Sequence, residues 1–110
     1  MKALWKCSVC GFIHDGAAAV CPKCGAAPEK FTQLDDAAAT LVERSRHTNC
    51  LHLKLAALAR EIDGICKDGQ ADNLDAGCAD VFRKSQAMSY TMMKLSMTEI
   101  QGHMGKGKWG

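Results

Sequence analysis

The stretch that decides the fold is WKCSVCG at residues 5–11, taken together with CPKCG at residues 21–25. Each holds two cysteines separated by two residues and followed by glycine; we call these turns the first knuckle (residues 7–11) and the second knuckle (residues 21–25). A CxxC-G turn places two sulfurs on one side, directs backbone N–H groups at them, and uses glycine to accept a positive φ. Two such turns supply four thiolates in a tetrahedron, which suits zinc or a single iron ion. The sequence therefore predicts a metal site formed by Cys7, Cys10, Cys21 and Cys24.

The alternatives for these cysteines are a redox-active CxxC pair or disulfide bonds. A redox CxxC normally opens a helix within a βαβ unit, and the sequence has no such pattern. The chain contains seven cysteines, an odd number, and its first seven residues lack the apolar segment of a secretory signal. We therefore expect a cytoplasmic protein, in which paired cysteines favour metal binding over disulfides.

The sequence around the two knuckles resembles the rubredoxin-like module of rubrerythrins. The resemblance spans residues 4–31 and is carried by WKCSVCGFIHDG (residues 5–16), CPKCGA (residues 21–26) and PEKF (residues 28–31). The short segment between the knuckles fits that module better than free-standing rubredoxin, whose loop is longer. The resemblance implies a small antiparallel sheet, one iron ion held by the four thiolates, and transfer of single electrons. It also favours iron over zinc, which no residue does by itself.

Apolar side chains near the knuckles are expected to shield the metal from water. The candidates are Trp5, Phe12, Ile13 and Phe31. Shielding and N–H···S hydrogen bonds are the features that tune the potential of such a centre. His14 is expected at the surface of a loop and not as a ligand.

Residues 35–104 have the pattern of an antiparallel helical hairpin. Two aspartates at 35 and 36 precede an alanine run, as at a helix start, and a polar stretch at residues 67–73 predicts the turn. Apolar residues recur at close to heptad spacing on both sides of that turn; they are Leu41, Leu51, Leu55, Leu58, Ile62, Ile65, Leu74, Cys78, Val81, Met88, Met92 and Leu95. The predicted organisation is thus a metal module at residues 1–33, the hairpin at 35–104, and a flexible tail at 105–110.

The hairpin also predicts a partner. A solitary pair of helices cannot cover both faces, so we expect two copies to form a four-helix bundle. The net charge is +2 with both signs interspersed, which gives no reason to expect nucleic acid or membrane as a partner. Polar residues at Ser45, Thr48 and His52 interrupt the apolar pattern, so this part of the helix is either exposed or holds a ligand or partner.

A second metal site is conceivable on the helices. Rubrerythrins use Glu-x-x-His motifs in a four-helix bundle, and this chain has none. It has Glu43 four residues before His47, and Glu99 four residues before His103, and each pair shares a helix face. The hairpin would bring both pairs to one end, where two copies could build a composite site. Ordinary solvated residues are the favoured interpretation.

Three hypotheses of function follow. The first is an electron-transfer protein that exchanges electrons with a partner oxidoreductase, in peroxide or oxygen defence by analogy with rubrerythrins. The second is a structural zinc ribbon whose helices serve protein interaction or dimerisation. The third is a metalloenzyme that uses the composite helical site. We expect electron transfer rather than catalysis by this chain alone.

Overall fold

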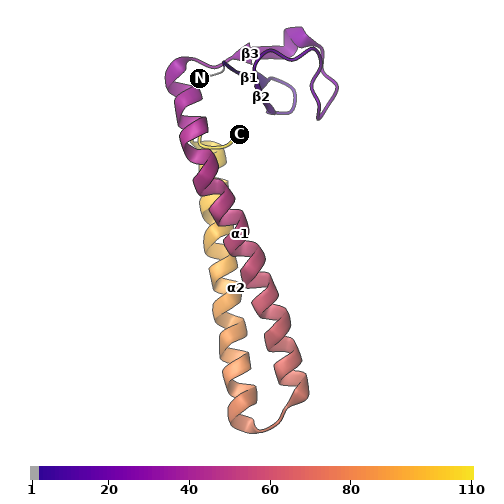
Figure 1. Cartoon of the computed structure of the whole chain (residues 1–110), viewed down its shortest axis with the longest axis vertical. Coiled ribbons are helices and arrows are strands. Elements are labelled where there is room, and N and C mark those ends of the chain that lie inside the picture. The colour runs from indigo at the N-terminus through magenta and orange to yellow at the C-terminus, as the bar shows by residue number, and fades with distance from the viewer. Residues whose placement is uncertain (1–2) are drawn as a thin grey trace. The chain divides into compact units, whose positions relative to one another are not determined.

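The computed structural model of the protein describes residues 3–110. It contains a small sheet followed by two long helices (Figure 1). Two compact units can be distinguished: Met1–Arg46 with Gly107–Gly110, and His47–Lys106. Within residues 3–110, neither helix combines the length and the apolar character needed to cross a lipid bilayer.

The sheet has three short antiparallel strands in the order β2-β1-β3. Their bounds are Leu4–Cys7 for β1, Ile13–Asp15 for β2 and Phe31–Gln33 for β3, and a turn of 3-10 helix, Pro28–Lys30, precedes β3. The central residue Trp5 pairs with His14 on one side and with Gln33 on the other. This confirms the small antiparallel sheet that the resemblance implied.

The two faces of the sheet carry separate apolar clusters, because successive side chains of a strand point to opposite faces. Leu4 is fully buried against Ala39 and Val42, and Ile13 packs on this cluster. The prediction that Ile13 shields the metal is therefore wrong. Ile13 pairs with Lys6 in the sheet, so its side chain lies on the face of Leu4 and not on the face of Cys7.

Arg46 connects three parts of this unit. Its guanidinium donates two hydrogen bonds to the carboxylate of Asp15 at the end of β2, at 2.7 and 2.9 Å, and its Nε donates to the carbonyl of Gly110 at 2.8 Å. The bidentate geometry is the strong form of an arginine–carboxylate contact. The flexibility that we expected of residues 105–110 stays a prediction; the contact to Gly110 was not foreseen.

Both predicted helices are present. They are α1, Asp36–Asp72, and α2, Ala76–Gly105. Asp35 caps α1 by accepting a hydrogen bond from the N–H of Ala38 at 2.7 Å, and Asp75 caps α2 in the same way through Cys78. The aspartates before the alanine run thus mark the helix start as predicted.

The turn predicted at residues 67–73 is shorter than expected. Helix α1 continues through Gly69 to Asp72, so that only residues 73–75 connect the helices, with Asn73 at a φ of 47°. Gly69 is a packing position, since a Cβ there would overlap the ring of Phe82 on α2. A glycine inside a polar stretch suggested a turn, but here it admits an aromatic ring.

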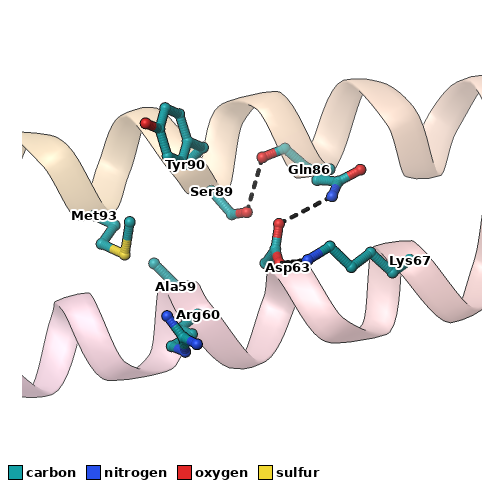
Figure 2. A pocket seen from close by; sticks show the side chains of 8 residues that line it. All are labelled: Ala59, Arg60, Asp63, Lys67, Gln86, Ser89, Tyr90 and Met93. Carbon is teal, nitrogen blue, oxygen red and sulfur yellow. Dashed lines mark hydrogen bonds and ion pairs between the residues drawn. The ribbon is translucent and has the colours of Figure 1, made fainter.

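The contact surface between α1 and α2, which we call the seam, consists mainly of small and polar residues, with Phe82, Met93 and Ile100 as its large apolar members. On α1 its members are Asn49, His52, Ala56, Ala59, Asp63, Cys66 and Gln70, and on α2 they are Phe82, Gln86, Ser89, Met93, Ser96, Ile100 and His103. Asp63 accepts a hydrogen bond from Gln86 and forms an ion pair with Lys67, both at 3.0 Å, beside a cleft of about 270 Å³ (Figure 2). Most of the predicted apolar stripe does not lie in the seam; Leu58, for example, is 56% exposed, whereas Ala59 is 1% exposed.

Candidate metal centre

The two knuckles have the same backbone conformation. In the first, the N–H of Gly11 bonds the carbonyl of Cys7, and in the second the N–H of Gly25 bonds the carbonyl of Cys21, each at 2.9 Å. Both glycines have the positive φ that the sequence predicted, 84° for Gly11 and 76° for Gly25. The N–H of the leading cysteine then bonds a carbonyl five residues later, at Phe12 or Ala26, and this closes each turn.

The knuckles bring all four predicted sulfurs together. The Sγ atoms of Cys7, Cys10, Cys21 and Cys24 lie within 4.8 Å of one another, with 3.7 Å between Cys7 and Cys24 and 3.5 Å between Cys10 and Cys21. A metal–sulfur distance of about 2.3 Å gives a tetrahedron with edges of about 3.8 Å, which these two separations approach. They are far longer than the roughly 2.05 Å of a disulfide bond. The arrangement fits one tetrahedral ion.

The electrostatics of the cluster also favour a bound cation. The backbone N–H of Cys10 lowers the pKa of Cys7 against the opposing effect of burial. Burial raises the pKa of Cys21 as well, but the N–H groups of Cys24 and Lys23 outweigh it and bring the pKa to about 6. For Cys24 the N–H of Ala26 lowers the pKa, yet burial and the three neighbouring sulfurs raise it to about 12. Without a metal, only some of the four cysteines are thus ionised, and a bound cation would allow all four to be thiolates at once.

The cluster is buried on one side and exposed on the other. Cys7 and Cys21 are 1% and 2% exposed and pack with the ring of Phe31, while Trp5 and Phe12 lie against them. Cys10 is half-buried, and Cys24 is exposed. A bound ion would therefore be shielded by aromatic rings on one side and reach the surface through the Cys24 sulfur.

His14 lies on β2 and not in a loop, and it is half-buried. Its Nδ1 donates a hydrogen bond to the carbonyl of Gly16 at 2.7 Å, and its ring is near Phe12 and Phe31. The histidine stabilises the turn after β2, and the expectation that it is not a ligand stays a prediction.

The second predicted site is not assembled in a single chain. Among residues 3–110, the four cysteines are the one group of three or more donor side chains close enough to share an ion. His47 and Glu99 are exposed, Glu43 is half-buried, and His103 approaches Glu99 only at 3.6 Å. A composite site built by two copies stays a prediction.

Sequence reasoning missed the actual neighbours of His103. Its Nδ1 donates to the Oδ1 of the buried Asn49 at 2.6 Å, and its ring lies beside that of His52, with 5.9 Å between the centroids. His52 in turn contacts the hydroxyl of Ser96 at 3.3 Å. Of the residues that interrupt the apolar pattern on α1, His52 thus has a partner on α2, whereas Ser45 donates to the carbonyl of Leu41 on its own helix at 2.7 Å. The available signal was that residues 49, 52 and 56 continue the spacing of Ala59 and Cys66.

This fold and this site define a small rubredoxin-like module with four cysteines able to hold a metal ion. A comparison with protein families agrees: residues 5–32 match the model described as the rubredoxin-like domain of rubrerythrin. The resemblance stated from the sequence is therefore confirmed for the N-terminal module, and the match ends before α1 begins. No curated protein and no solved structure matches the chain.

Proposed function

We propose that the module binds one iron ion through Cys7, Cys10, Cys21 and Cys24 and carries single electrons to or from a partner oxidoreductase. The observation that carries this proposal is the four-sulfur cluster with one exposed corner. Four protein ligands leave no coordination position for a substrate, so the bound ion serves structure or electron exchange rather than substrate activation.

The surrounding residues suit electron exchange. When bound, iron supplies a ferric/ferrous couple, and four thiolates hold similar geometry in both states. The knuckle N–H groups that lower the pKa of Cys7 and Cys21 also stabilise negative charge on their sulfurs. Trp5, Phe12 and Phe31 exclude water from the buried side. The exposed Cys24 sulfur offers electrons a short path to a docked protein.

A role in peroxide or oxygen defence rests on the family match alone, because the matched domain is that of rubrerythrin. The alternative is a structural zinc ribbon, since the same four thiolates also accept zinc. The two differ in whether the bound ion can change its oxidation state.

The test is metal content and colour of the full chain expressed anaerobically with both iron and zinc available. We expect one iron per chain, red colour from thiolate-to-iron charge transfer after oxidation, and bleaching by dithionite with one electron per chain. Cys24→Ser should change the spectrum, whereas Cys50→Ser should not, because Cys50 is an exposed cysteine outside the cluster. Colourless protein with one zinc per chain would reject electron transfer. More than one ion per chain, with the excess lost in His103→Ala, would favour the metalloenzyme instead.

A further inference from the structure

The large apolar side chains of the hairpin are on its outside. Nine of them form two rows, which are Leu51, Leu55, Leu58, Ile62 and Ile65 on α1 and Val81, Met88, Met92 and Leu95 on α2. Their exposed fractions run from 37% for Met92 to 71% for Met88. We call these nine side chains the apolar face.

The two rows form one continuous face, which follows from helix geometry. Each residue of the two rows directly precedes a seam residue in the sequence; for example, Leu58 precedes Ala59, and Met88 precedes Ser89. One residue turns a right-handed helix by about 100°. For two antiparallel helices that face each other across the seam, this turn points both rows to the same side. Figure 1 shows α1 and α2 running side by side along the hairpin.

The rows also lie at the same level along the hairpin. Gln86 donates to Asp63 in the half of the seam nearer the connection between the helices, and His103 donates to Asn49 at the far end. This register places Leu58 level with Met92, so that both rows cover the same length. None of the nine positions is charged.

The opposite side of the hairpin, one residue after each seam position, has a different character. It carries Arg60, Lys67, Arg83 and Lys94 among its residues. The exposed apolar side chains on that side, such as Leu53, Tyr90 and Met97, are interspersed with these charges, whereas the two rows of the apolar face contain none.

The size of the apolar face fits an interface. At roughly 60 Å² for each half-exposed large side chain, the nine present about 500 Å² of apolar surface. That lies near the upper end of the largest patch on a monomer, about 300–600 Å². This is more than half of the roughly 800 Å² that each partner contributes to a stable dimer.

We propose that the apolar face of a second copy of this chain covers this one, giving a two-fold symmetric four-helix bundle. A two-fold interface must be self-complementary, and two level, uncharged rows meet that condition without a second kind of surface. The methionines on α2 adapt their shape to the facing leucines and isoleucines. When two hairpins pair into a bundle, each helix is expected to bury one of its sides in the shared core.

The test compares identical changes on the two sides of the hairpin. Leu58→Glu lies on the apolar face, and its matched control Leu53→Glu lies one residue after the seam residue His52, with 52% of the leucine exposed. On α2 the pair is Leu95→Glu and Met97→Glu, with 66% and 55% exposed. The mass of the full, metal-loaded chain is measured in solution by light scattering and sedimentation over a hundredfold range of concentration.

We expect wild type, Leu53→Glu and Met97→Glu to have twice the chain mass, and Leu58→Glu and Leu95→Glu to dissociate at least a hundredfold more readily. If the two variants lose their helices on dissociation, the wild-type helical melting temperature must still rise with protein concentration. A wild type that is monomeric throughout overturns the proposal and leaves the face to a different partner. So do equal losses in the test and control variants, or a dimer unaffected by Leu58→Glu and Leu95→Glu. The colour of the metal centre is recorded in the same samples, so failure of the dimer is separable from failure of electron transfer.

Discussion

The packing of Phe82 on Gly69 gives a prediction in which one substitution has opposite effects at two positions of the same helix. Gly64 and Gly69 both lie within α1. A Cβ at position 64 would meet no atom within 4 Å, whereas a Cβ at position 69 would overlap the Phe82 ring. Gly64→Ala should therefore stabilise the hairpin, and Gly69→Ala should destabilise it.

The magnitudes follow from two terms. Alanine in place of glycine in a helix interior favours folding by about 0.8–1 kcal/mol, and Gly64→Ala should show most of that gain. Gly69→Ala gains the same propensity term but overpacks the contact, which costs about 1–3 kcal/mol. A Cβ at position 69 is held in place by the backbone and cannot move away from the Phe82 ring. We therefore expect Gly69→Ala to lower the free energy of unfolding by about 1 kcal/mol, and the two variants to differ by about 2 kcal/mol.

The assay is urea unfolding followed by helical circular dichroism at one fixed chain concentration. Phe82→Leu combined with Gly69→Ala should recover part of the loss, and the double-mutant cycle isolates the pair. Equal stabilisation by both alanines would show that the Phe82 ring does not rest on Gly69, and would refute the assignment of Gly69 as a packing position.

Three further predictions concern the metal centre and the helix contacts. Cys21→Ser should lose the bound ion and the fold of the module together, as measured by metal analysis and near-ultraviolet dichroism, while the helical signal remains. Asp75→Ala removes the cap of α2 and should cost about 1 kcal/mol in urea unfolding. Hydrogen bonds from Gln86 and Lys67 hold the pKa of Asp63 below its usual value, so its contribution is complete above about pH 4 and is lost as the pH falls through the folded-state pKa. Acid titration of helical stability should accordingly be shallower in Asp63→Asn than in wild type.

The parts of the fold that the sequence predicts are those set by local chemistry. Two CxxC-G turns dictate their own conformation, and Asp35 before an alanine run dictates a helix start. The connection at residues 73–75 was missed because Gly69 has two uses, in a turn or under a ring, and only the tertiary contact with Phe82 decides between them. The face of Ile13 was missed because it depends on strand register, which one residue reverses.

The candidate site divides in the same way. The four cysteines are close in sequence, so their spacing alone predicts that they converge. The residues that contact His103, Asn49 and His52, are more than fifty residues away along the chain. An error of one residue in the alignment of the two helices would place another residue of α1 opposite His103. The pairing of Glu99 with His103 needed only helical spacing, but what faces His103 across the seam depended on how the two helices are rotated.

That rotation has a further consequence for stability. Heptad spacing predicts an apolar stripe on each helix but not which surface the stripe meets. In this hairpin the seam is made close by small residues such as Ala59, Ser89 and Ser96, whose burial contributes little hydrophobic free energy. The large side chains that would contribute most are one residue away and exposed. If a second copy covers them, the free energy of unfolding of the helices must depend on protein concentration, whereas metal binding at the four cysteines, which needs only one chain, must not.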